Sequence, residues 1–233
     1  MKTRQIFRHI TDFFFPRSCV SCGRILASGE QFICLPCLTA LPRTRFHLHA
    51  DNRMEKNLWG KLPFERAASW LFYSKASLTY RIIAELKYRG NGDLGLFLGR
   101  CMAEELLPSG FFQGISCIIP VPLHSSRLRQ RGYNQSGKLA EGIAQRTGIP
   151  VCTEAVVRHK KTESQTHKAG FMRWTAMQDA FTCTQPDMLR DKHVLLLDDV
   201  MTTGATIVAC ADACRDIPGI RFSILTLAVA GYQ

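Results

Sequence analysis

Two adjacent carboxylates, Asp198 and Asp199, stand between an apolar run and a segment rich in threonine. The apolar residues at 194–197 predict a buried strand, and the pattern at 205–214 predicts a helix. Parallel sheets bind their ligands beyond the carboxyl ends of strands, so this junction is well placed for a binding site. The two acids can accept hydrogen bonds from ribose hydroxyls and hold a hydrated Mg²⁺ indirectly.

The segment after the acids has the residue types that bind a phosphate group. It contains Thr202, Thr203, Gly204, Ala205 and Thr206. Threonine hydroxyls donate to phosphate oxygens, the glycine allows close approach, and a helix N-terminus presents unpaired N–H groups. We predict a site for a phosphorylated ribose. An ordinary strand–turn–helix with a threonine cap is the structural alternative.

An arginine-rich segment follows a short apolar strand predicted at 117–121. Its basic residues are Arg127, Arg129 and Arg131, and the segment contains no acid. The guanidinium fork binds pairs of phosphate oxygens, so Arg127 and Arg131 are predicted to bind phosphate groups of the ligand, and Arg131 is also a catalytic candidate. A solvated basic turn explains the same residues without a ligand.

Two more basic segments are candidates for ligand contact. The stretch 158–180 is long and polar, includes Lys161 and Arg173, and is typical of a lid that closes over a substrate. A loop with no catalytic role is the alternative. Lys87, Tyr88 and Arg89 end a predicted helix, where interaction with the helix dipole explains their charge equally well.

Four cysteines form two C-x-x-C pairs, Cys19 with Cys22 and Cys34 with Cys37. Two such pairs supply the four thiolates of a closed tetrahedral Zn²⁺ site. A closed site leaves no position for a substrate, so the expected role of the zinc is structural. A redox role for a single C-x-x-C pair is the weaker reading, because two pairs occur together.

These candidates are set in an alternating order of strands and helices, which predicts an α/β fold with a parallel sheet. The predicted strands are 67–73, 117–121, 151–157, 194–197 and 222–230, and the predicted helices are 78–87, 94–107, 136–147 and 205–214. The helix at 136–147 has a cap near Asn134 and a closing Gly148. The expected organisation is a four-cysteine zinc module at 1–45, a connection at 46–66 and the main domain at 67–233.

The composition is that of a folded protein with polyanionic partners. Of 233 residues, 46% are hydrophobic and 21% charged, and the net charge is +11. This charge favours nucleic acid or phosphorylated small molecules, although a solvated basic surface would also carry it. No apolar stretch reaches the roughly 20 residues of a membrane span, and charges interrupt the N-terminal segment. A cytoplasmic location is expected, where ten cysteines bind metal or are buried instead of forming disulfides.

Residues 198–206 resemble the fingerprint of the type I phosphoribosyltransferases. The whole chain, from about Cys19 to Ala230, resembles the ComF/GntX family: a four-cysteine module, an Arg-Gly-Tyr-Asn-Gln segment at 131–135, and the acid-threonine loop. The resemblance implies a type I phosphoribosyltransferase-like parallel sheet flanked by helices, with a small zinc-ribbon-like module. It also places Gln165 and Arg173 at positions of the family pattern, within the flexible loop.

Three functions are consistent with these observations. The resemblance implies binding of phosphoribosyl pyrophosphate with Mg²⁺ and a role in uptake or utilization of external DNA, with catalysis by Asp198, Asp199 and Arg131 on an unknown acceptor. A second hypothesis is a non-catalytic accessory protein that binds single-stranded DNA, in which the phosphoribosyl site is a sensor or a relic. A third is a scaffold whose zinc module docks a helicase or membrane component of the DNA-uptake machinery. The apolar face of Ile6, Ile10, Phe13 and Phe14 is a candidate for such docking, and packing on the zinc module explains it equally well.

Overall fold

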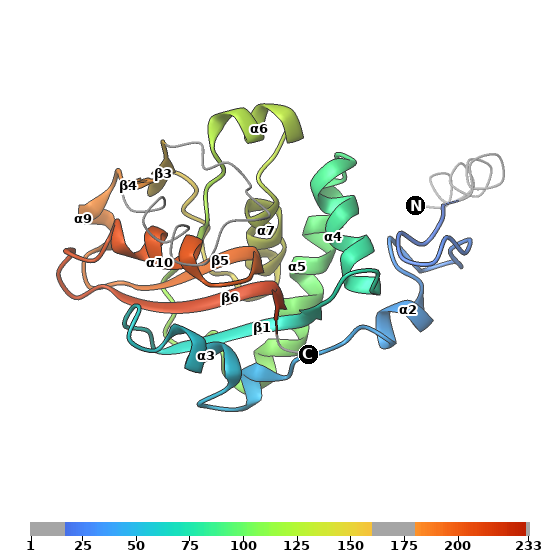
Figure 1. The fold of residues 1–233 in the computed structure, drawn as a ribbon, viewed down its shortest axis with the longest axis horizontal. Coiled ribbons are helices and arrows are strands. Elements are labelled where there is room, and N and C mark those ends of the chain that lie inside the picture. Colours follow the sequence, from blue (N-terminus) through green and yellow to red (C-terminus); the bar gives the residue numbers. More distant parts are fainter. Residues whose placement is uncertain (1–16, 160–179, 232–233) are drawn as a thin grey trace.

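The structure is a computed structural model that describes residues 17–159 and 180–231 (Figure 1). The loop candidates Lys161, Gln165 and Arg173 lie outside the described residues, as do the N-terminal apolar positions proposed for docking. Every helix in the described part of the chain is too short or too polar to cross a membrane.

A four-stranded parallel sheet forms the centre of the molecule, in the order β1-β6-β5-β2. Its strands are β1 (Arg66–Tyr73), β6 (Arg221–Ala230), β5 (His193–Met201) and β2 (Cys117–Pro120). Nearly every residue of β6 is buried, because helices cover both faces of the sheet. The predicted fold class, a parallel sheet flanked by helices, is confirmed.

The helices that cover the sheet are α4 (Leu78–Tyr88), α5 (Gly92–Leu106), α7 (Gln135–Thr147) and α10 (Ala205–Asp212). In Figure 1, α5 and α7 lie behind the strands and α10 lies in front of them. The helices α5 and α7 pack at close range, since a Cβ on Gly142 would stand 2.3 Å from the Leu96 carbonyl oxygen. This packing holds α7 against α5.

The N-terminus of α7 is held at the carboxyl end of β2. The Asn134 side chain accepts a hydrogen bond from the Ser136 N–H and donates one to the Val121 carbonyl (3.1 Å). Gly148 closes the helix in the left-handed conformation, as the sequence predicts. The first turn of α7 is therefore fixed next to the end of the neighbouring strand, β5.

Three of the sequence predictions differ from the structure by more than a small shift of a boundary. The strand expected at 194–197 continues through both acids to Met201, because Val200 and Met201 still pair with β6. The basic loop after β2 contains a helix, α6 (Ser125–Arg131), which the side chain of His124 caps. The strand expected at 151–157 is wrong, because an exposed bend at 153–154 interrupts it.

What replaces that strand is a short antiparallel hairpin. Val151 forms only an isolated bridge to Ile118, and β3 (Val156–Arg158) pairs with β4 (Phe181–Cys183). The remaining elements are α2 (Leu35–Thr39), η1 (Phe46–Leu48), α3 (Arg53–Leu58), η2 (Leu107–Ser109) and α9 (Pro186–Leu189).

The segment expected to be a connection, 46–66, contains the helix α3. Asn52 begins this helix with a capping box to Glu55, and its Nδ2 donates to the Ala67 carbonyl in β1 (2.9 Å). Asn52 is buried, so its five polar contacts fix α3 against the edge of the sheet. As a result Leu58 at the end of α3 reaches the loop after β5.

Candidate functional site

Both acids of the predicted site lie near the carboxyl end of β5, and each is held by a separate donor. Asp198 Oδ1 accepts hydrogen bonds from Ser136 Oγ (3.1 Å) and from the Asp199 N–H (2.8 Å). Asp199 Oδ2 pairs with Lys87 Nζ at 3.1 Å. Donors from two helices, α7 and α4, thus orient the two carboxylates.

The environment of the acid pair favours protonation of one of its two carboxyl groups near neutral pH. Burial and the neighbouring Asp199 carboxylate raise the pKa of Asp198 to about 7, although the Asp199 N–H, Lys87 and Ser136 act in the opposite direction. A cation or hydroxyl donors placed on the pair would stabilise the ionised form. The pair is therefore suited to bind a ligand that brings either of these.

The loop that follows β5 leads directly into α10. Thr202 and Thr203 are exposed, and Thr206 is partly buried in the first turn of the helix. Gly204 has φ +82° at the helix N-terminus, and a Cβ there would stand 2.9 Å from Leu58 Cδ2. Its backbone conformation and its close neighbour both favour glycine. The exposed hydroxyls and the N-terminus of α10 together suit a phosphate.

The arginine-rich segment and the end of α4 are in contact. Arg131 Nη1 donates to Gln135 Oε1 (2.8 Å), and the Arg131 guanidinium lies 5.7 Å from the centre of the Tyr88 ring. Tyr133 Oη donates to the Leu86 carbonyl oxygen at 2.5 Å. Two basic clusters that are far apart in the sequence therefore meet on the side of the sheet where Lys87 pairs with Asp199.

Sequence reasoning missed three features of this site. It did not identify Ser136 as a partner of Asp198, nor Lys87 as a partner of Asp199. It included Arg158 only as the first residue of the polar stretch 158–180 and gave it no role of its own. Burial lowers the pKa of Arg158, the charge of Arg127 lowers it further and that of Asp198 raises it, so Arg158 senses charges from both the arginine segment and the acid pair. A serine at the first position of a predicted helix carries no pattern that would have marked it.

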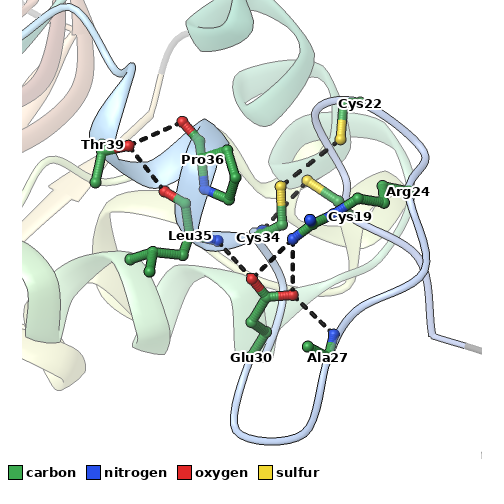
Figure 2. A network of polar contacts seen from close by, with 9 residues as sticks. All are labelled: Cys19, Cys22, Arg24, Ala27, Glu30, Cys34, Leu35, Pro36 and Thr39. Carbon is green, nitrogen blue, oxygen red and sulfur yellow. Dashed lines mark hydrogen bonds and ion pairs between the residues drawn. The ribbon is translucent and has the colours of Figure 1, made fainter.

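The four cysteines come together as predicted. Their sulfur atoms all lie within 4.8 Å of one another. Figure 2 shows three of the four, with Cys22 Sγ and Cys34 Sγ 3.7 Å apart. A tetrahedral ion with Zn–S bonds of ~2.3 Å separates its sulfurs by about 3.8 Å. Burial would raise the pKa of Cys19, but the N–H groups of Cys34, Cys22 and Ser21 lower it to about 6. The cluster can hold a metal ion.

A carboxylate braces the two knuckles of this cluster. Glu30 accepts hydrogen bonds from the Leu35 N–H (2.7 Å) and the Ala27 N–H (2.8 Å), and it pairs with Arg24 Nη2 at 3.0 Å (Figure 2). The two backbone donors lower the pKa of Glu30. Glu30 thus links the turn after the first cysteine pair to the helix α2 that carries the second.

The other six cysteines were expected in the core, and the structure divides them. Cys117, Cys210 and Cys214 are buried, and Cys101, Cys152 and Cys183 are partly buried.

A cavity of about 790 Å³ lies elsewhere, between the cysteine module and the α4–α5 turn, lined in part by Arg17, Phe32 and Arg100. The acid pair is not among its lining residues. We locate the candidate site by its charged groups and their contacts, because cavity size alone points to a different place.

Comparison with known proteins supports a phosphoribosyltransferase-like domain. A family model described as the phosphoribosyl transferase domain matches residues 134–226, from the cap of α7 to β6. The "DNA utilization protein YhgH" of Escherichia coli (strain K12) is 28% identical over 84% of this chain and 89% of that protein.

Two competence proteins match shorter parts. "Competence protein F" of Haemophilus influenzae is 35% identical over 39% of this chain and 40% of its own length. "Competence protein ComFC" of Bacillus subtilis is 23% identical over 58% of this chain and 52% of its own length. With its phosphoribosyltransferase-like domain and N-terminal four-cysteine cluster, the chain belongs to the ComF family.

Proposed function

We propose that this chain binds phosphoribosyl pyrophosphate with Mg²⁺ and acts as a cytoplasmic phosphoribosyltransferase in the uptake or utilization of external DNA. One observation carries the proposal. Asp198 and Asp199 lie near the carboxyl end of a parallel strand, each is held by its own donor, and both precede a threonine-rich helix N-terminus. The biological role comes from the names of the relatives.

Each group of residues is assigned one part of the ligand. Asp198 and Asp199 accept hydrogen bonds from the ribose hydroxyls, and the loop 202–206 binds the 5-phosphate. Arg127 and Arg131, with Lys87 nearby, face the pyrophosphate. Mg²⁺, when bound, supplies further positive charge to the pyrophosphate oxygens.

The reaction would break the bond between the anomeric carbon and pyrophosphate and form one to an acceptor nucleophile. The pyrophosphate leaves with the bonding electron pair, so cationic groups around it would supply most of the rate enhancement. Lys161, Gln165 and Arg173, which lie outside the described residues, remain predicted ligand contacts. A structural Zn²⁺ at Cys19, Cys22, Cys34 and Cys37 and the domain division at 45 and 66 also remain proposals.

Calorimetric titration with phosphoribosyl pyrophosphate and Mg²⁺ tests the binding site. We expect micromolar affinity in the wild type and loss of binding in the double variant Asp198→Asn/Asp199→Asn. The matched control is Asp187→Asn/Asp212→Asn, which removes two acids outside the site. A folded wild type that does not bind, or a double variant that binds as well, would contradict the proposal. Catalysis is tested separately by release of pyrophosphate with bases, orotate or amines as acceptors.

Binding of single-stranded DNA is a second candidate function, favoured by the contact between the two basic clusters. The exposed Arg89 and Arg129 extend this basic surface beyond the residues assigned to pyrophosphate. Phosphate contacts predict an affinity that falls steeply between low and moderate salt. Arg129→Gln should weaken binding of a fluorescent oligothymidylate, measured by anisotropy. Binding that is absent or indifferent to salt would exclude this function.

A further inference from the structure

Tyr88 is the most exposed large apolar side chain in the described part of the chain. Its exposed fraction is 76%, and it is the last residue of α4. A ring that remains in water gains little from the hydrophobic effect, so packing does not account for an aromatic residue here.

A set of contacts places this exposed ring at the edge of the candidate phosphoribosyl site. The preceding residue, Lys87, pairs with Asp199 at 3.1 Å. The Arg131 guanidinium lies 5.7 Å from the centre of the Tyr88 ring and is fixed by Gln135. The next residue of α7, Ser136, donates to Asp198. Tyr88 is therefore linked to both acids, from α4 on one side and from α7 on the other.

The ring is also held in place at low entropic cost. The turn that carries Arg131 is anchored to α4 by the bond from Tyr133 Oη to the Leu86 carbonyl. A tyrosine has only two side-chain torsions, so ordering its ring costs little conformational entropy. Ordered aromatic rings beside an arginine are the surfaces on which nucleobases stack in proteins.

From these contacts we infer that Tyr88 is a stacking surface for a planar nitrogenous base, either joined to the bound ribose phosphate or about to be joined to it. The inference rests on the proposed function, because the acid pair and the loop 202–206 must hold the sugar and its phosphate. It names the acceptor class as nucleobases and excludes small aliphatic amines.

The test compares AMP with ribose 5-phosphate by calorimetric titration, since the two share the sugar phosphate and differ by the base. In the wild type, AMP should bind about 5- to 150-fold more tightly, the range that base–aromatic stacking supplies. Tyr88→Ala should remove this advantage and leave the affinity for ribose 5-phosphate unchanged. Tyr88→Phe should keep it, because the ring and not the hydroxyl is needed.

The matched control is Tyr80→Ala, which removes a less exposed tyrosine from the other end of the same helix. A second comparison measures the affinities for a short oligothymidylate and for an abasic strand of equal length. It distinguishes a base that is free or part of a mononucleotide from a base that belongs to a nucleic acid. If Tyr88→Ala weakens only AMP, the base arrives free or as a mononucleotide. If it also abolishes the preference for the strand with bases, a nucleic acid presents the base.

Failure of the inference can be told apart from failure of the proposed function. If ribose 5-phosphate binds but AMP binds no more tightly, or if Tyr88→Ala leaves the ratio unchanged, the stacking role is overturned and the phosphoribosyl site stands. If neither ribose 5-phosphate nor phosphoribosyl pyrophosphate binds the folded wild type, both are wrong.

Discussion

Arg81 Nη1 donates a 2.7 Å hydrogen bond to the carbonyl oxygen of Ser21, inside the first cysteine knuckle. Arg81 lies on α4, and the same helix ends at Lys87 and Tyr88. One helix of 11 residues therefore touches the cysteine cluster at one point and the acid pair through Lys87 at another. The cysteine module and the candidate site therefore share contacts with one helix, α4.

Removal of a bound metal should unfold the cysteine module and weaken ligand binding at the acid pair as well. A module this small cannot bury enough apolar surface to fold without its ion. We expect chelation to lower the melting temperature and the affinity for phosphoribosyl pyrophosphate, measured by calorimetry. Arg81→Met should lower the free energy of unfolding by about 1–3 kcal/mol, the contribution of a charged hydrogen bond.

The control for this experiment is Arg215→Met, which removes an exposed arginine just after α10. If chelation leaves the affinity unchanged while the module unfolds, α4 does not couple the two regions.

Replacement of Lys87 by methionine should impair the acid pair. Methionine keeps most of the side-chain volume but removes the Nζ cation that lies 3.1 Å from Asp199 Oδ2. The two adjacent carboxylates then lack a neighbouring positive charge. We expect the affinity for phosphoribosyl pyrophosphate to fall more than about tenfold, because a charge-assisted contact is lost. Lys192→Met, at the opposite end of β5, should bind normally. Equal binding by the two variants would contradict the assigned role of Lys87.

Gly204→Ala should be more destabilising than an alanine at another left-handed glycine. Gly204 has φ +82°, and its added Cβ would stand 2.9 Å from Leu58 Cδ2. Gly148 has φ +73° with no atom within 4 Å of an added Cβ. Gly148→Ala therefore measures only the free-energy cost of placing alanine in the left-handed conformation, about 1–2 kcal/mol.

Chemical denaturation of the two variants gives both losses of unfolding free energy. Combining Leu58→Ala with Gly204→Ala should recover part of the difference, because it removes the close contact. Equal losses in Gly204→Ala and Gly148→Ala would show that Leu58 moves aside without cost.

The stability of the ligand-free protein should depend on pH through Asp198. The pKa of this carboxyl is raised from 3.8 to about 7, so between these values the folded chain holds a proton that the unfolded chain has released. The free energy of unfolding therefore falls as pH rises from about 4 to about 7. Asp198→Asn should remove this fall.

Melting temperatures of wild type and Asp198→Asn across this pH range, without Mg²⁺, provide the measurement. The difference between the two curves isolates Asp198 from the histidines, which titrate in both proteins. For a chain of this size each 1 kcal/mol shifts the melting temperature by about 2–4 °C. Parallel curves would mean that Asp198 is ionised throughout.

Local patterns predicted well where the determining residues are neighbours in the chain. Asn134 and Gly148 bound the helix α7 at the expected positions, because caps act within one turn. The strand expected at 151–157 failed for the opposite reason. Its apolar residues resemble a buried strand, but a bend and pairing with the distant β4 decide its structure.

By itself, the sequence determined the chemistry that this chain can offer: two acids before a threonine-rich turn, an arginine segment, and four cysteines in two close pairs. Those groupings are contiguous, so spacing alone brings their side chains together. Only the tertiary structure decided which groups face the acids. Ser136 meets Asp198 across 62 residues, and Lys87 and Tyr88 meet the site only because α4 ends beside the α6–α7 turn. Such contacts depend on sheet order and helix packing, which no local pattern encodes.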